Sequence, residues 1–207
     1  MFRGGFVRTE EEKIELLKNL GGMTLQEKWD LVLDISAQED VPSIDQIKQI
    51  QHLVSETPKG VKKVLVVGCG DGTELSEFEA KGYKVTGIQV NKKENARIRA
   101  KGLDARDVDM HFMPFKNKEF DMVYCKDCFK QALSPTLAFA EFCRVSKKYI
   151  MLSEPDFSWI WKAHNYQLFS PEQFQAFGQK FGFPLEKYWV LDMGYVKQQN
   201  YLFERTK

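Results

Sequence analysis

The sequence has 207 residues, 43% of them hydrophobic and 29% charged, with 30 basic and 29 acidic side chains and a net charge of +1. This composition predicts an ordinary globular domain and argues against a disordered chain. No apolar run approaches the ~20 residues that a membrane span needs, and the first residues lack a signal-peptide core. The balanced charge disfavours binding to duplex DNA. We therefore expect a cytoplasmic protein without a membrane association.

The cysteines do not form a recognisable framework. There are too few of them, too irregularly spaced, for a disulfide scaffold: Cys69, Cys125, Cys128 and Cys143. Cys125 and Cys128 have the spacing of metal ligands, but no second pair completes a tetrahedral site. We expect buried thiols and no metal.

The chain falls into two parts. Helical periodicity with capping signals predicts helices at residues 10–20, from Thr24 to about Ile35, and from Ser43 to about Thr57. Residues 1–60 are thus expected to form an N-terminal helical cap. Residues 61–207 are expected to form the main domain, in one structural unit with the cap.

Strands and helices alternate through the main domain. Strands are predicted near residues 61–67, 83–90, 120–125, 149–153, 187–191 and 195–204, with a short, irregular one within 103–109. Helices are predicted at about 73–81, 91–101, 134–145 and 170–182. This alternation predicts an α/β fold, a doubly wound and mostly parallel seven-stranded sheet with helices on both faces.

A glycine-rich loop, Gly68-Cys-Gly-Asp-Gly72, follows the first strand. Glycine lets backbone turn tightly and approach a ligand, and the following helix offers free N–H groups. In doubly wound sheets, ligands bind at the carboxyl ends of the strands. A dinucleotide loop has its third glycine where this chain has Thr73, which disfavours a nicotinamide cofactor.

Five segments in order resemble the motifs of class I S-adenosylmethionine-dependent methyltransferases. They are the G-x-G-x-G loop with Asp71, Val85–Asn91, Asp109–Phe115, Phe120–Cys125, and Glu141-Phe-Cys-Arg-Val145 with the strand after it. The resemblance covers residues 61–155 well and 168–205 loosely.

The resemblance implies S-adenosylmethionine (SAM) as cofactor, with S-adenosylhomocysteine (SAH) as product. It also implies a set of cofactor-binding residues: Val67, Gly68, Cys69, Gly70, Asp71, Gly72, Gln89, Val90, Asp109, Met110 and Cys125. In the family, the position of Gln89 holds the ribose hydroxyls and that of Asp109 the adenine amino group. The family usually has Asp or Glu at position 89, and a neutral amide there costs on the order of 1 kcal/mol of binding.

The acceptor is expected to be a small molecule, because the motifs of nucleic-acid methyltransferases are missing; a protein or peptide acceptor is the alternative. Weak catalytic candidates are Asp127, Glu154 and His164. Carboxylates at strand ends also serve in loop solvation or helix capping. Trp159, Trp161 and Tyr166 would form either an aromatic wall for the substrate or a hydrophobic lid. His111 is expected to be an ordinary surface residue.

Two competing functions remain. The chain could bind SAM without transferring its methyl group, as a regulator or a non-catalytic subunit, which the unusual Gln89 motivates. An NAD(P)-dependent oxidoreductase is the less favoured reading. The sequence does not indicate the oligomeric state.

Overall fold

The computed structural model describes residues 43–156, 169–192 and 197–206. The two helices predicted before residue 43 lie outside the described residues, as do Trp159, Trp161, His164 and Tyr166. No helix in the described ranges has the length and apolar character to cross a bilayer.

The strands form one seven-stranded sheet in the order β3-β2-β1-β4-β5-β7-β6. The strands are β1 (Lys63–Val67), β2 (Lys84–Gln89), β3 (Ala105–Asp107), β4 (Phe120–Lys126), β5 (Ser146–Pro155), β6 (Leu185–Asp192) and β7 (Lys197–Glu204). β1 to β5 pair in parallel, whereas β7 is antiparallel to both β5 and β6. The sheet is therefore mixed, and its strand order reverses between β1 and β4.

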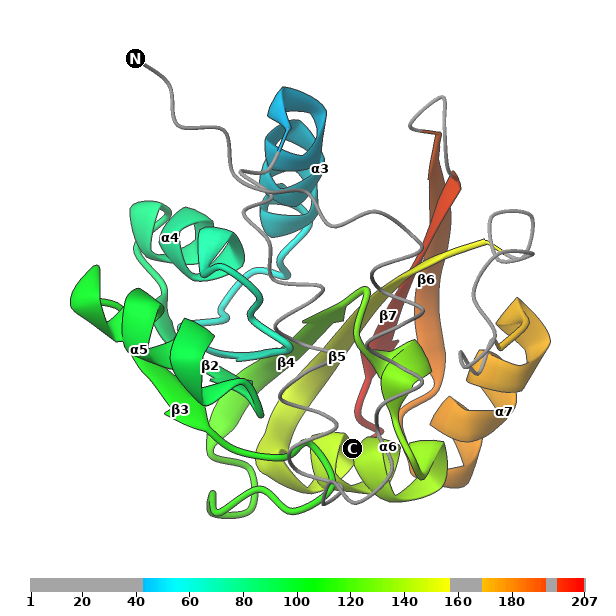
Figure 1. Ribbon diagram of the computed structural model, residues 1–207. Coiled ribbons are helices and arrows are strands. Elements are labelled where there is room, and N and C mark those ends of the chain that lie inside the picture. Colours follow the sequence, from blue (N-terminus) through cyan, green and yellow to red (C-terminus); the bar gives the residue numbers. More distant parts are fainter. Residues whose placement is uncertain (1–42, 157–168, 193–196, 207) are drawn as a thin grey trace, which may run out of the picture. The chain divides into compact units, whose positions relative to one another are not determined.

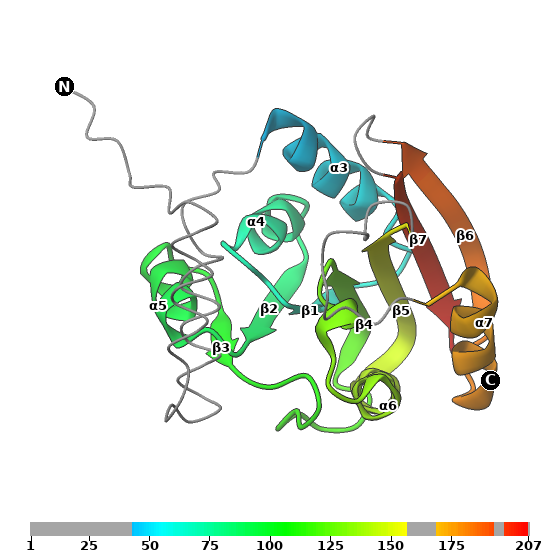
Figure 2. The same ribbon diagram turned by 45° about the vertical axis from the view of Figure 1, so that its right-hand side comes forward.

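Helices cover both faces of the sheet (Figures 1 and 2). One buried cluster holds side chains of α3 (Ile44–Ser55), α4 (Thr73–Ala80) and α5 (Lys92–Ala100). The other holds side chains of α6 (Pro135–Val145) and α7 (Pro171–Lys180). The α/β prediction is confirmed in this coarse form.

The central strand shows why the sheet is buried on both faces. Val64 and Val66 of β1 belong to the cluster beneath α3 and α4. Leu65 and Val67 belong to the cluster on the opposite face. Because successive strand side chains point to opposite faces, a strand covered on both sides is apolar throughout, which is the pattern of residues 64–67.

Several helix starts follow their capping signals. The Asn91 side chain accepts hydrogen bonds from two backbone N–H groups at the start of α5. Ser134 caps α6 with Pro135 at its first position, and Ser170 and Gln173 form a capping box at α7. The strand predicted at 149–153 is longer, because β5 begins at Ser146, immediately after α6.

Helix α3 packs with the sheet. Ile50, Leu53 and Val54 are buried in the same cluster as Leu75 and Phe78 of α4. Residues Ile44–Lys207 accordingly form one compact unit. This unit begins inside the segment expected to be the cap, because the apolar face of α3 has its partner on α4.

Candidate cofactor and acceptor site

The glycine-rich loop joins β1 to α4 at the point where the strand order reverses. Gly68, Gly70 and Gly72 all have positive φ, at 73°, 51° and 90°. A Cβ on Gly72 would lie 3.2 Å from Ile98, so packing within the chain explains why residue 72 is a glycine. A Cβ on Gly70 would meet nothing within 4 Å. Gly70 therefore faces open space, which is the arrangement that a closely approaching ligand requires.

Asp71 stabilises the loop from within. Its carboxylate accepts hydrogen bonds from the Thr73 backbone N–H (3.0 Å) and from the Thr73 hydroxyl (2.9 Å). The Lys101 ammonium donates to the Asp71 carbonyl at 3.0 Å. The first turn of α4 is thus fixed by the acidic residue that precedes it.

Gln89, at the end of β2, is tied to the same loop. Its side-chain Nε2 donates to the carbonyl oxygen of Gly70 at 2.9 Å. A carboxylate at this position has no proton with which to make that bond. This bond explains in part why an amide stands at position 89: its Nε2 crosslinks the loop, and its Oε1 remains as an acceptor. The next residue, Val90, has an unusually exposed apolar side chain, at 39%.

Asp109 and His111 connect the segment after β3 to the start of α6. Asp109 Oδ1 accepts from the His111 backbone N–H at 2.8 Å and lies 2.5 Å from His111 Nδ1. His111 Nε2 accepts from the Ser134 backbone N–H at 3.2 Å, so the ring proton is assigned to Nδ1. His111 is only 7% exposed. The expectation of a surface histidine is therefore wrong, because the ring fills the space between this segment and α6.

The Glu141 and Arg144 side chains clamp the segment that follows. Glu141 accepts from the Met113 backbone N–H at 2.8 Å. Arg144 donates to the carbonyls of Met113 and Phe115, each at 2.7 Å, and lies 2.5 Å from Glu141. The E-x-x-R sequence thus acts structurally, by fixing the backbone between β3 and β4.

The other half of the site lies at the ends of β4 and β5, where Asp127 occupies a strained position. Its φ is 55°, which lets the chain turn sharply after β4. Lys126 Nζ lies 2.5 Å and Lys130 Nζ 3.5 Å from its carboxylate, and Gln198 of β7 donates to it at 2.8 Å. These partners lower the pKa of Asp127 against the effect of its burial.

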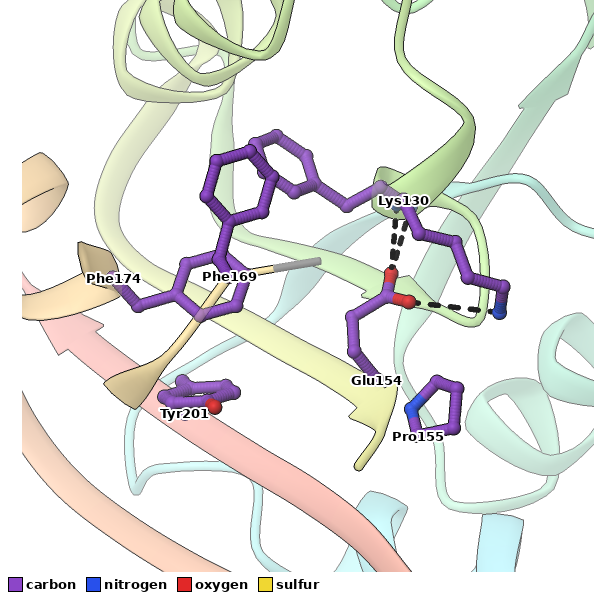
Figure 3. Close-up of a pocket in the computed structure, with 7 residues that line it drawn as sticks. Lys130, Glu154, Pro155, Phe169, Phe174 and Tyr201 are labelled. Carbon is purple, nitrogen blue, oxygen red and sulfur yellow. Dashed lines mark hydrogen bonds and ion pairs between the residues drawn. The ribbon is translucent and has the colours of Figure 1, made fainter. Parts of the chain in front are cut away.

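Glu154 of β5 lies with its carboxylate against Lys130 (Figure 3). Its Oε1 accepts from the backbone N–H groups of Phe129 (2.8 Å) and Lys130 (3.4 Å), and its Oε2 lies 3.5 Å from Lys130 Nζ. The side chain is nearly inaccessible, and this burial raises the pKa of Glu154 to about 7, against the opposing effect of Lys130. Glu154 therefore caps the turn at Phe129–Gln131.

A small pocket opens beside Glu154 (Figure 3). It is lined by Phe129, Lys130, Glu154, Pro155, Phe169, Phe174 and Tyr201. The aromatic rings that line the pocket pack on one another, and the ring centroids of Phe174 and Tyr201 are 4.4 Å apart. The pocket therefore combines apolar walls with one buried carboxylate–ammonium pair.

The structure brings Asp127 and Glu154 together through Lys130, whereas the third catalytic candidate, His164, lies outside the described residues. Sequence reasoning missed Lys130 and Gln198. Lys130 lies three residues after Asp127, which is a weak signal for an ion pair. Nothing in the sequence relates Gln198 to Asp127, because β7 arrives from a distant part of the chain.

The residues expected at the cofactor gather along one edge of the sheet. Val67 pairs with Ile88 and with Cys125, and the Val108 backbone N–H donates to the Gln89 carbonyl. The loops after β1, β2, β3 and β4 are therefore neighbours. The side chains of Val67, Cys69 and Cys125 are buried, so these residues can offer only backbone to a ligand. Met110 is half-buried and packs on the core. Among the described residues, no three His, Cys, Asp or Glu side chains are grouped to hold a metal.

Residues 65–149 match the family described as "Methyltransferase domain". No curated protein matches the sequence. Magnesium protoporphyrin IX methyltransferase from Synechocystis PCC 6803, solved with bound SAH, superposes with a TM-score of 0.67 at 12% identity over 94% of this chain and 100% of its own.

Two further solved structures are similar. Geranyl diphosphate methyltransferase in complex with SAM has a TM-score of 0.67 and 12% identity, with 78% of this chain and 86% of its own covered. The [4+2]-cyclase SpnF has a TM-score of 0.65 and 16% identity, with 76% and 80% covered.

The family match and the fold agree. Residues 65–149 match a methyltransferase domain, the sheet has the fold of the solved SAM-dependent methyltransferases, and the motif segments occupy the loops at its carboxyl edge.

Proposed function

We propose that the protein transfers a methyl group from SAM to a small-molecule acceptor. The observation that carries this proposal is the glycine loop at the reversal of strand order, where Gly70 faces open space and Gln89 holds the loop in place. Bound SAM would supply a methyl group that its sulfonium has already activated. The task of the protein is then to align the acceptor with that methyl group and to exclude water.

The described residues fit the polar parts of SAM. The loop before α4 leads into the N-terminus of that helix, whose partial positive charge suits an anionic group of the cofactor. Gln89 Oε1 is suited to a ribose hydroxyl, and Asp109 to an amino group. The exposed side chain of Val90 is suited to a flat apolar ring.

The support for a small-molecule acceptor comes from the comparisons, since the pocket beside Glu154 has aromatic walls and an ion pair but is too small for such a compound. Two structural neighbours are named for small-molecule methyl acceptors, a magnesium porphyrin and geranyl diphosphate.

A second candidate function is the binding of SAM without methyl transfer. The similarity to SpnF favours it, since a protein of this fold is named as a cyclase. Transfer of labelled methyl groups from SAM to a broad acceptor panel separates the two functions.

The first experiment is calorimetric titration with SAH, SAM and NADH. We expect micromolar binding of the first two and none of NADH. Gly70→Val places a branched side chain in the open space of the loop and is expected to weaken SAH binding by more than about 100-fold, or about 2.7 kcal/mol.

Gly82→Val is the matched control. Gly82 also has a positive φ, of 85°, and a Cβ on it also meets nothing within 4 Å, but it lies in the turn before β2. Its backbone strain is comparable and its SAH affinity should equal that of the wild type. If the folded wild type binds neither SAH nor SAM, or if both variants lose binding equally, the proposed cofactor site is wrong.

A further inference from the structure

Positive charge gathers at one edge of the sheet, where β2, β1, β4 and β5 begin and the antiparallel β7 ends. The methyl-transfer proposal does not use this edge. We call its residues, 62–63, 84, 116–121, 147–148 and 204–206, the basic edge. The whole chain has a net charge of +1. The basic edge, in contrast, holds three carboxylates, Glu119, Asp121 and Glu204, and eight basic side chains: Lys62, Lys63, Lys84, Lys116, Lys118, Lys147, Lys148 and Arg205.

Hydrogen bonds hold the segments of the basic edge against one another. Asp121 Oδ2, at the start of β4, accepts from the backbone N–H of Lys62 at 2.9 Å. The Lys84 N–H donates to the Lys62 carbonyl at 2.9 Å, and the Arg205 N–H donates to the Lys148 carbonyl at 2.8 Å. The positive side chains are therefore carried by a fixed backbone frame that joins neighbouring strands.

Only part of this positive charge is neutralised within the chain. The three carboxylates each pair with one lysine: Glu119 with Lys63 at 2.9 Å, Asp121 with Lys147 at 3.8 Å and Glu204 with Lys148 at 3.0 Å. The Arg205 guanidinium is held by the backbone and donates to the Ser146 carbonyl at 2.8 Å. No ion pair within the described residues involves the other four lysines, which are exposed: Lys62, Lys84, Lys116 and Lys118. These four ammonium groups remain for a partner.

The basic edge has the form of a row. Neighbouring strands lie about 4.8 Å apart, so its five strand ends span about 19 Å. Lys84 of β2 lies opposite Lys63 of β1, and Lys148 lies on β5, two strands beyond β1. A phosphate backbone presents its negative charges in a line of this kind, and lysine ammonium groups bind phosphates as point charges. The basic edge therefore suits a linear polyanion.

The other side chains of the basic edge narrow the choice of polyanion. None of its aromatic side chains is exposed, so it lacks the stacking surfaces with which proteins bind single-stranded nucleic acids. It also exposes no large apolar side chain that would enter a lipid bilayer. A duplex keeps its bases stacked inside and offers only its phosphates to such a surface. The observations therefore favour a double-stranded nucleic acid over a single strand or a membrane.

We propose that the basic edge binds the phosphate backbone of a double-stranded nucleic acid without reading its sequence. This binding goes beyond methyl transfer and does not depend on it. The expectation against duplex DNA came from the total charge, but a duplex responds to the local charge of the surface that it contacts. The glycine loop lies at the opposite ends of the strands, about 20 Å away along β4 (Phe120–Lys126). The cofactor site therefore stays open while the duplex is bound.

The test is fluorescence anisotropy of the full chain with labelled duplexes of about 20 base pairs, one of RNA and one of DNA. We expect dissociation constants of about 1–100 µM near physiological salt, independent of sequence. If all four free lysines contact phosphates, the logarithm of the affinity should fall against that of salt concentration with a slope of about −3.6. Similar affinities for the two duplexes are expected, and a preference for one of them identifies the source of the backbone.

Two double variants locate the contact. Lys62→Gln with Lys84→Gln removes two ammonium groups from the basic edge, and should weaken duplex binding about tenfold or more and reduce the salt slope by about 1.8. Lys48→Gln with Lys92→Gln is the matched control. It removes the same total charge from exposed lysines of α3 and α5 and should bind as the wild type does. All four positions are exposed, so urea titration should show wild-type stability for both variants.

The proposal is overturned if neither duplex binds, if the two double variants weaken binding equally, or if salt leaves the affinity unchanged. Tighter binding to a single strand of the same length also overturns it, as does binding to phosphatidylserine vesicles but not to duplexes. Competition between SAH and the duplex would place the contact at the cofactor loops instead. Because anisotropy with a duplex needs no SAH, failure of the proposed cofactor site and failure of the basic edge are distinguished.

Discussion

The two halves of the proposed site are held together by different kinds of interaction. The cofactor half, made of the loops after β1, β2 and β3, relies on backbone: glycines with positive φ, capped turns and carbonyls fixed by Gln89 and Arg144. The proposed acceptor half, at the ends of β4, β5 and β7, relies on charge, with Lys130 and Glu154 buried and the partly exposed Asp127 in one network.

The difference has an energetic consequence. Hydrogen bonds contribute about 0.5–1.5 kcal/mol each between neutral groups, so the cofactor half should tolerate the loss of a neutral one such as the Gln89–Gly70 bond. Buried charges are costly to leave without a partner. The acceptor half should therefore respond more strongly to single substitutions and to pH.

The largest expected effect comes from removing the shared cation of the acceptor half. Lys130→Met keeps the length of the side chain but takes the cation away from the buried Glu154 carboxylate, while Asp127 keeps Lys126. We expect a loss of about 3 kcal/mol in the free energy of unfolding at about pH 9, where Glu154 is ionised, measured by urea titration. The loss should shrink toward neutral and acidic pH, where Glu154 is protonated and no longer needs a cation.

Lys148→Met is the control for that substitution. Lys148 pairs with Glu204 at 3.0 Å, but its side chain is 52% exposed. It should leave stability unchanged within error. Equal effects of the two substitutions would contradict the contrast between buried and exposed pairs.

The second effect is the pH dependence of stability through Glu154. Burial raises the pKa of Glu154 from 4.5 to about 7 in the folded protein, so between these values the folded state binds more protons than the unfolded state. Stability therefore falls as pH rises through this window, by about 3 kcal/mol from this group.

Glu154→Gln should remove that part of the slope, because the amide still accepts from Phe129 N–H but does not titrate. Glu74, whose pKa burial also raises, to about 6, adds a slope of the same sign that persists in the variant. Asp127, with its lowered pKa, acts at more acidic pH. Unfolding titrations at about pH 5 and pH 7.5 would contradict the assignment if both proteins lost the same stability.

The smallest effect is expected at Gln89. Gln89→Glu supplies the charged acceptor usual in the family but loses the bond to the Gly70 carbonyl. Each contribution is about 1 kcal/mol, so they offset, and SAH affinity should change by less than about fivefold. Calorimetry giving a much tighter complex would show that the loop does not need the Gln89 crosslink.

Sequence alone determined the features that depend on neighbours along the chain. The alternation of strands and helices, the caps at Asn91, Ser134 and Ser170, and the apolar run of β1 all follow from local periodicity and capping chemistry. The glycine loop and the order of the five motifs are also local features, because each motif is a short contiguous segment. The short β3 was also visible, as a charged stretch with little room for a buried strand.

Only the tertiary structure decided which side chains share a partner. The antiparallel entry of β7 places Gln198 against Asp127, and the ring of His111 becomes buried because the start of α6 packs over it. Glu154 has a raised pKa because the fold removes water from around it, and no spacing in the sequence encodes that loss. Solvation and long-range pairing are properties of the assembled sheet, so the network of Asp127, Lys130 and Glu154 forms only when its strands come together.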